Sequence, residues 1–170
     1  MTTTQTKNEN TPYVLSKTAT ADIDKWLAKF PNGNSRPVIL RALWIVQEEN
    51  GGWLSTDAMD AVADYLQQPK INVYEVAKFY SLYELEPVGK YKIHICTNIS
   101  CMLNGSDEIE SHLKNKLKIN FNETTKDGKF TLKKAECLAA CGGAPAMQIN
   151  WKYYENLTPE KIDKILGKLE

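Results

Sequence analysis

The spacing of apolar residues changes near residue 87. Before that point, apolar side chains recur every three or four positions, which is the period of an amphipathic helix. This pattern predicts four helices, at about residues 20–30, 36–49, 56–68 and 72–83. Because short segments separate them, these helices are expected to pack as a small bundle.

Residues that favour helix ends define the predicted boundaries. Thr20 is expected to cap the first helix, and Ser55 or Thr56 the third. The fourth is expected to open at Asn72, after Pro69 ends the third. The polar residues 1–12 lack the apolar content of a packed core and are predicted to be disordered.

After Pro87 and Gly89 the pattern changes to strict alternation. Apolar residues at 91, 93 and 95 alternate with Lys92 and His94, which predicts a half-buried strand running into Cys96. Ser106 is expected to cap a helix that follows. Further strands are predicted at 129–133 and 147–150, and a last helix from residue 158. This order predicts a compact domain with a mixed sheet.

The chain as a whole is therefore predicted to be an α+β protein. An irregular segment over residues 1–19 is expected to precede a helical bundle domain at 20–86 and a sheet-containing domain at 87–170. Each of the two domains is long enough to form a small core of its own.

Composition narrows the range of functions that the chain could have. The chain has 21 basic and 21 acidic residues, a balance that argues against a protein that works by gripping nucleic acid or an anionic membrane. No apolar run approaches the roughly 20 residues that span a bilayer. The first ten residues have no apolar core, so no signal peptide is expected. In a reducing cytoplasm, the four cysteines are then expected to be metal ligands or catalytic thiols.

The cysteines form two close pairs. Cys96 and Cys101 are separated by four residues, Cys137 and Cys141 by three, and 35 residues lie between the pairs. Each pair follows a predicted strand, where a rigid scaffold can hold side chains in convergent directions. A [2Fe–2S] cluster needs four thiolates, two on each iron, and two such pairs supply them. Small residues around the second pair would let backbone N–H groups approach the sulfurs, and Thr97 and Ser100 are candidate hydroxyl donors.

Spacing alone leaves other sites open. A structural zinc ion also accepts four cysteines, although zinc pairs more often have the tighter C-x2-C spacing. A thiol–disulfide device is a third possibility, which the absence of C-x-x-C disfavours. His94 lies two residues before Cys96, so a ligand role of the Rieske type competes with that of an ordinary histidine on a strand face.

The cysteine segments Cys96-Thr-Asn-Ile-Ser-Cys-Met-Leu-Asn-Gly105 and Glu136-Cys-Leu-Ala-Ala-Cys-Gly-Gly-Ala-Pro145 resemble one known family. It is the 24-kDa-type, thioredoxin-like [2Fe–2S] subunit of respiratory complex I, NADH:quinone oxidoreductase. Three other segments are similar to its helical and C-terminal parts: 42–47, 75–80 and 154–159. The resemblance covers about residues 20–170.

The resemblance implies an N-terminal helical domain joined to a thioredoxin-like ferredoxin domain. Cys96 and Cys101 would ligate one iron, and Cys137 and Cys141 the other. The cluster would exchange electrons with FMN on a partner, the flavin-bearing NADH-oxidising subunit, with other peripheral-arm subunits nearby. Both NADH and FMN would bind that partner, which agrees with the lack of a Gly-rich dinucleotide fingerprint here. The complex would sit peripherally on the cytoplasmic side of a bacterial inner membrane. NAD-linked hydrogenases and formate dehydrogenases, which use similar modules, are alternative hosts.

Two backbone positions carry specific expectations. The family commonly has Gly where this chain has Ala139, and a left-handed alanine would cost about 1–2 kcal/mol. A negative φ is therefore predicted at Ala139. Pro145 precedes a predicted strand, where thioredoxin-like folds often hold a cis proline, and cis and trans are equally expected.

Overall fold

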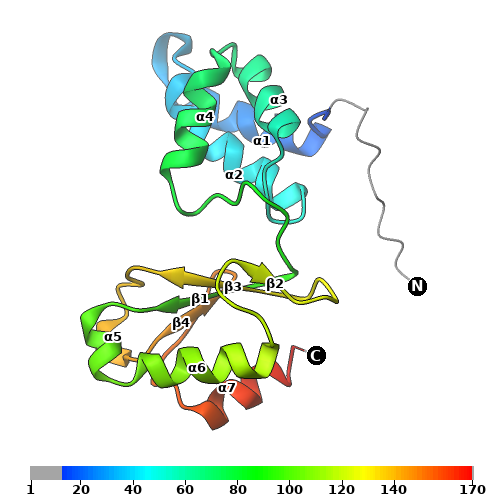
Figure 1. Ribbon diagram of the computed structural model, residues 1–170. Coiled ribbons are helices and arrows are strands. Elements are labelled where there is room, and N and C mark those ends of the chain that lie inside the picture. Colours follow the sequence, from blue (N-terminus) through cyan, green and yellow to red (C-terminus); the bar gives the residue numbers. More distant parts are fainter. Residues whose placement is uncertain (1–12, 170) are drawn as a thin grey trace. The chain divides into compact units, whose positions relative to one another are not determined.

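The computed structural model describes residues 13–169. The chain divides into two compact units, with the boundary between Pro87 and Val88 (Figure 1). The polar segment 1–12, predicted to be disordered, lies outside the described residues. The two units are described separately below.

The first unit contains the four predicted helices. They are α1 (Lys17–Leu27), α2 (Ile39–Glu49), α3 (Thr56–Leu66) and α4 (Lys70–Phe79), with short 3-10 turns at Pro31–Gly33 and Arg36–Val38. Their apolar faces meet in one core, whose largest fully buried side chains are Ile23, Ile39, Leu43 and Leu54. The 3.6-residue period therefore identified this bundle correctly.

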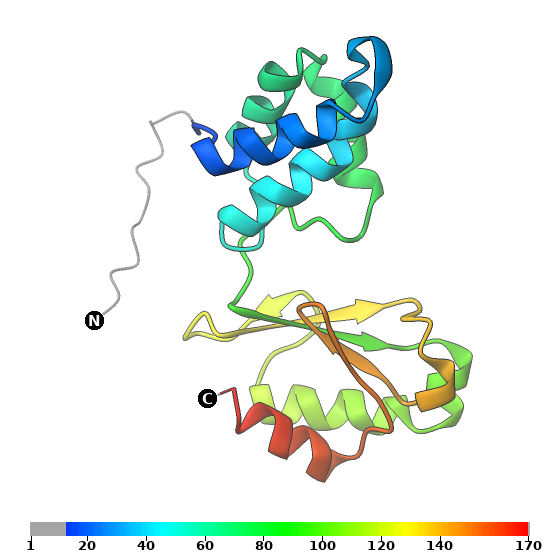
Figure 2. The same cartoon turned by 180° about the vertical axis from the view of Figure 1, so that it is seen from behind.

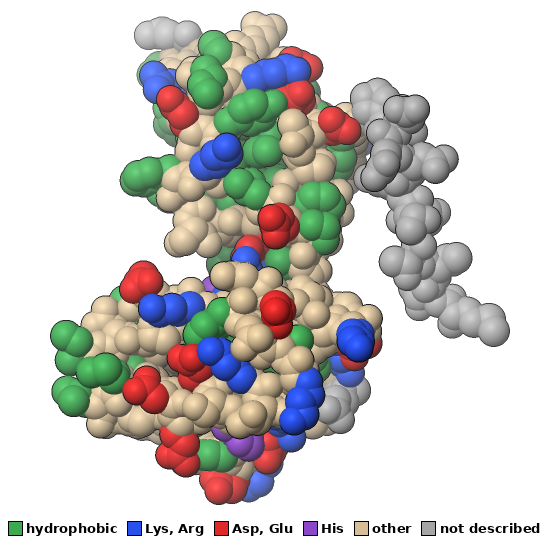
Figure 3. Space-filling view, in the orientation of Figure 1, with side chains coloured by type: hydrophobic (Ala, Val, Ile, Leu, Met, Phe, Trp, Pro, Cys, Tyr) green, Lys and Arg blue, Asp and Glu red, His purple; other side chains and the backbone are tan. Residues whose placement is uncertain are grey.

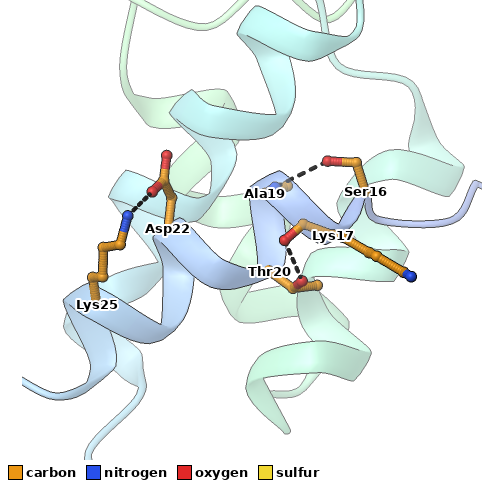
Figure 4. Close-up of polar contacts among 6 residues, drawn as sticks. All are labelled: Ser16, Lys17, Ala19, Thr20, Asp22 and Lys25. Carbon is orange, nitrogen blue, oxygen red and sulfur yellow. Dashed lines mark hydrogen bonds and ion pairs between the residues drawn. The ribbon is translucent and has the colours of Figure 1, made fainter.

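The first helix begins one turn earlier than predicted. Ser16 is the cap, because its Oγ accepts a hydrogen bond from the backbone N–H of Ala19 at 2.9 Å. Thr20 lies inside the helix, where its hydroxyl donates to the Lys17 carbonyl at 3.0 Å (Figure 4). One turn further on, Lys25 pairs with Asp22 on an exposed face. The prediction of Thr20 as the cap is therefore wrong: three hydroxyl residues, Ser16, Thr18 and Thr20, lie in this segment, and a helix that starts after Ser16 includes the fully buried Ala19.

Two other helix starts differ from the prediction. Helix α4 opens at Lys70 directly after Pro69, rather than at Asn72. Ser106 is the first residue of α6 (Ser106–Leu117) and not its cap, a place held by Gly105 with a left-handed φ of 91°. Glycine adopts this conformation without steric cost. The backbone conformation of Gly105, and not a side-chain cap, therefore sets the start of this helix.

The second unit is built on a mixed five-stranded sheet with strand order β2-β3-β1-β4-β5. Strand β1 (Tyr91–Cys96) pairs in parallel with β3 (Phe130–Ala135) and antiparallel with β4 (Met147–Ile149). The short strands β2 (Glu123–Thr124) and β5 (Lys152–Tyr154) complete its edges. The mixed sheet was predicted, whereas β2 and β5 were not.

Helices α6 and α7 (Pro159–Leu166) cover the same face of this sheet (Figures 1 and 2). A second core lies between them and the strands, centred on Ile93, Ile95, Leu113, Leu132 and Ile162. The short helix α5 (Ile99–Leu103) follows β1. It lies at the end of the sheet where β1 reaches its carboxyl terminus, and the cysteines lie at this same end.

Candidate metal centre

Strand topology brings the two cysteine loops together. Strands β1 and β3 are parallel and in register to their last residues, where Cys96 is opposite Ala135. The carboxyl ends of parallel neighbours lie at the same edge of a sheet. The loop after Cys96 and the loop after Ala135 therefore start side by side, and Cys137 follows only two residues later.

The four cysteines differ in exposure. Cys96 ends β1 and Cys101 lies in α5, and both are buried. Cys137 and Cys141 lie on the connection from β3 to β4, and both are exposed. Small or apolar residues pack around the buried pair, namely Leu138, Ala140, Ala144 and Ala146. None of the four cysteines forms a disulfide.

The thiols form one connected group. The Cys101 and Cys137 thiols help to lower the pKa of the Cys96 thiol, and Cys96 and Cys141 help to raise that of Cys101. Thus the structure brings together all four residues that the sequence singled out. Among residues 13–169, no group of three or more His, Cys, Asp or Glu side chains is placed to hold a single metal ion. A [2Fe–2S] cluster needs two thiolates on each iron, so the cysteines need to approach one another in pairs and not all around one ion.

Burial and hydrogen bonding act in opposite directions on the buried pair. Burial tends to raise the pKa of the Cys96 thiol, but hydrogen bonds from backbone N–H groups and neighbouring thiols outweigh it, so that pKa is lowered. For Cys101, burial and the adjacent Cys96 raise the thiol pKa. Cys96 is thus the thiol of this pair whose negative form the surroundings favour.

Backbone N–H groups surround the sulfurs, as the small residues of the second loop suggested. The backbone N–H groups of Asn98 and Leu138 lower the pKa of the Cys96 thiol, and that of Ala146 acts in the same direction on Cys101. The Ala139 amide donates to the Cys137 Sγ at 3.3 Å. Such donors stabilise negative charge on cluster sulfurs. This donor set fits a thiolate-bound iron–sulfur group.

The expected hydroxyl donor at Thr97 has a different partner. Its Oγ1 donates to the Ala135 carbonyl at 3.4 Å, which places this hydroxyl in the contact between β1 and β3. The donors to sulfur in this site are therefore backbone amides, which the sequence predicted near the second cysteine pair without identifying the residues.

The prediction of a negative φ at Ala139 is wrong, because the residue has a φ of 55°. The left-handed turn follows from the sulfur contacts on either side of it. The successive amides of Leu138 and Ala139 point at two different sulfurs, those of Cys96 and Cys137. The left-handed conformation of Ala139 is thus strained but directs its N–H at a cysteine sulfur.

Glycine at position 139 is expected to stabilise the second unit. Ala139→Gly removes a left-handed Cβ, and the gain in unfolding free energy should be about 0.5–1 kcal/mol after the extra freedom of the unfolded chain is included. Ala140→Gly is the matched control, since Ala140 has a φ of −107° and should lose stability. Denaturant unfolding of the full chain measures both. Equal effects of the two substitutions would contradict a strained Ala139.

The second cysteine loop is closed by the segment after β5. The Asn156 amide donates to the Gly143 carbonyl at 2.6 Å, and the Leu157 amide to the Pro145 carbonyl at 3.1 Å. The peptide bond between Ala144 and Pro145 is cis, one of the two forms expected. This segment therefore supports the loop through two backbone hydrogen bonds.

Alanine at Gly143 is expected to disturb this support. A Cβ there would lie 2.6 Å from the Cβ of Glu155, so the two segments must separate. A loss of about 1–3 kcal/mol in unfolding free energy is expected for such overpacking. Gly142→Ala is the control, because a Cβ on Gly142 would meet nothing within 4 Å and the loss should be small. Thermal unfolding followed by circular dichroism distinguishes them, and equal losses would exclude the steric explanation.

Apolar side chains are exposed beside the cysteines. Ile99 and Leu103 in α5 are 67% and 76% exposed, and Met102 is 46% exposed. Figure 3 shows hydrophobic side chains gathered at the end of the second unit where α5 lies. His94, the other candidate ligand, lies within β1 opposite Lys133 and Gln148. The helix that carries Cys101 thus exposes apolar side chains next to the site.

A thioredoxin-like sheet edge with four converging cysteines defines a class of iron–sulfur ferredoxin. The family model described as "Thioredoxin-like [2Fe-2S] ferredoxin" matches residues 23–170. This chain belongs to that family.

Relatives extend along nearly the whole chain. An NADH-quinone oxidoreductase subunit of Rickettsia typhi is 44% identical over 161 residues, covering 95% of each protein. The mitochondrial NADH dehydrogenase [ubiquinone] flavoprotein 2 of Dictyostelium discoideum is 38% identical over 98% of this chain and 68% of its own length.

A solved structure shares the fold. The air-oxidized NAD+-reducing [NiFe]-hydrogenase matches 82% of this chain with a TM-score of 0.69 at 21% identity. This chain spans only 24% of that hydrogenase chain. The match supports the predicted fold class and carries no assignment of activity.

Proposed function

We propose that this chain is the [2Fe–2S] electron-transfer subunit of an NADH:quinone oxidoreductase. The observation that carries the proposal is that Cys96, Cys101, Cys137 and Cys141 all lie at or just after the carboxyl ends of the parallel strands β1 and β3, with the Ala139 amide donating to the Cys137 Sγ. The family match and the relatives of complex I support it.

In this proposal Cys96 and Cys101 ligate one iron, and Cys137 and Cys141 the other. The bound cluster would supply one-electron oxidation and reduction. The chain's own residues hold the thiolates in place and direct the amides of Asn98, Leu138 and Ala139 at sulfur. These amides would stabilise the extra negative charge of the reduced cluster and so contribute to its potential.

The electron partner is proposed to be FMN on a flavin-bearing subunit that also binds NADH. This chain then acts as part of an oxidoreductase without a nucleotide site of its own. The exposed apolar side chains of α5, with Phe79 at the end of α4, are consistent with burial against other subunits. No helix in the described part of the chain is long and apolar enough to cross a membrane. We place the chain peripherally, on the cytoplasmic side of the inner membrane, through its partners.

Low-temperature EPR of the anaerobically purified chain tests the cluster. An S = 1/2 signal that appears only after dithionite, with about two irons per chain, is expected for one [2Fe–2S] cluster. Iron and zinc are assayed on the same sample. A sample without EPR signal that holds about one zinc per chain would instead identify a structural zinc site.

The host complex needs a separate experiment. Affinity purification of the tagged chain from its own cell is expected to recover a flavin-containing subunit together with NADH:quinone reductase activity. Recovery with hydrogen-dependent or formate-dependent NAD+ reduction would reassign the host while leaving the cluster assignment intact.

A further inference from the structure

The two ligand loops are joined beyond the end of the sheet by one side chain. The last backbone bond between β1 and β3 runs from the Thr97 amide to the Ala135 carbonyl, at 3.1 Å. One residue further on, the Asn98 Nδ2 donates to the Glu136 carbonyl at 3.1 Å. Glu136 immediately precedes Cys137. The Asn98 side chain therefore extends the contact between the strands to the residue before the second cysteine pair.

The same side chain also orders the first loop. Its Oδ1 accepts from the Ile99 amide at 2.8 Å, and Asn98 occupies the cap position of α5, the helix that contains Cys101. The backbone N–H of Asn98 donates to the Cys96 sulfur. One residue thus contacts three parts of the site: the Cys96 sulfur, the start of the Cys101 helix and the residue before Cys137.

We propose that Asn98 is a positioning residue that fixes the distance between the two cysteine pairs. It does so through its amide group, with the oxygen holding the first loop and the nitrogen holding the second. This inference rests on the proposed cluster, because the fixed spacing matters for a group that both loops must ligate. The contact is exposed, so water competes with it and a moderate effect is expected.

The two functions of the side chain can be separated by substitution. Serine is as good a helix cap as asparagine but is too short to reach the Glu136 carbonyl, so Asn98→Ser keeps the cap and removes the link. Asn98→Ala removes both. Asn104→Ala is the matched control, because the Asn104 Nδ2 donates to the Ser100 carbonyl at 2.7 Å within the first loop only.

The experiment measures cluster release from the purified, cluster-containing chain into excess iron chelator, followed by visible absorption. Asn98→Ser is expected to release iron about threefold to fivefold faster than the wild type, as expected for one partly exposed hydrogen bond. Asn98→Ala should be faster still, and Asn104→Ala should resemble the wild type. Release from Asn98→Ser at the wild-type rate, with only Asn98→Ala accelerated, would overturn the link and leave a simple helix cap.

Two further readouts separate positioning from general stability. The midpoint potential of Asn98→Ser should shift to more negative values, because displacement of the second loop weakens the interaction of the Leu138 N–H with the Cys96 sulfur. In the metal-free chain, amide exchange over residues 137–141 should accelerate without a change in the sheet core. An unchanged potential together with unchanged exchange would refute the proposal. A wild-type chain that holds no iron would refute the proposed function instead, and the exchange measurement would still test the link.

Discussion

Serine in place of Cys96 is expected to give a folded chain that holds no [2Fe–2S] cluster. Two backbone N–H groups and two neighbouring thiols lower the pKa of the Cys96 thiol, which favours its thiolate form. Serine retains the shape but does not readily lose its proton, and iron–sulfur clusters require thiolates. Because Cys96 is only 3% exposed, water has little access to replace the missing ligand.

The measurement combines visible absorption, iron content and far-ultraviolet circular dichroism on the full chain. Absorption and iron should both be lost, while the dichroism signal should remain, since the core around Ile93 and Ile95 is unchanged. Cys137→Ser should give the same loss although Cys137 is exposed, because both pairs are needed. Thr97→Val is the control, since the Thr97 hydroxyl bonds the Ala135 carbonyl and not a sulfur. Full iron content in Cys96→Ser would remove Cys96 from the ligands.

The sequence identified the parts of the fold that repeat over several turns or several strand residues. The bundle helices and α6 each present an apolar face over ten or more residues, which is long enough for the helical period to be recognised. Strand β1 was visible from the alternation of its apolar residues with Lys92 and His94. Its place between β3 and β4, which also buries Lys92, was not. The four cysteines were found because thiols are rare and their spacing is unusual.

Short elements escaped prediction because they lack a period. Strands β2 and β5 have two and three residues, and their existence depends on the edges that β3 and β4 offer. Helix α5 has five residues and leaves Ile99 and Leu103 in solvent, so its apolar residues do not mark a buried face. Such elements are determined by tertiary contacts, which one sequence does not display.

The details of the site escaped for a related reason. Ala139 takes a left-handed turn that its residue type disfavours, because the sulfur contacts of the loop outweigh the local preference. Asn98 joins loops that are 38 residues apart in the chain. Backbone donors such as Leu138 carry no sequence signal at all, since every residue except proline has an amide. The candidate ligands could therefore be named from the sequence, whereas the contacts that position them could not.

The first unit contains a buried polar contact that the apolar pattern also concealed. Gln47 in α2 is 1% exposed. Its Nε2 donates to the Leu82 carbonyl at 3.1 Å, and its Oε1 accepts from the Glu84 amide at 2.7 Å. The Glu84 carbonyl in turn accepts from the Leu54 amide at 2.7 Å. One side chain therefore replaces the missing backbone partners of the segment that leaves the bundle after α4.

Leucine at position 47 is expected to lower the unfolding free energy of the first unit by about 2–4 kcal/mol. The side chains are similar in size, so little packing is lost, but a buried N–H and a carbonyl both lose their partner, each at a cost of about 1–3 kcal/mol. Trp26, Trp44 and Trp53 lie in this unit and Trp151 in the other. Denaturant unfolding followed by tryptophan fluorescence, in a Trp151→Phe background, therefore reports on the first unit alone.

Gln68→Leu provides the matched control for the same chemical change. The Gln68 Nε2 donates to the Ser35 hydroxyl at 2.9 Å in a half-buried position, where water can replace the lost partner. Its loss should stay below about 1 kcal/mol, because only groups hidden from water bear the full cost of an unmade hydrogen bond. If Gln47→Leu proved as mild as Gln68→Leu, the segment after α4 would have to reach water on losing Gln47. The Gln47 side-chain amide would then be buried as a consequence of helix packing and would contribute little to the stability of the first unit.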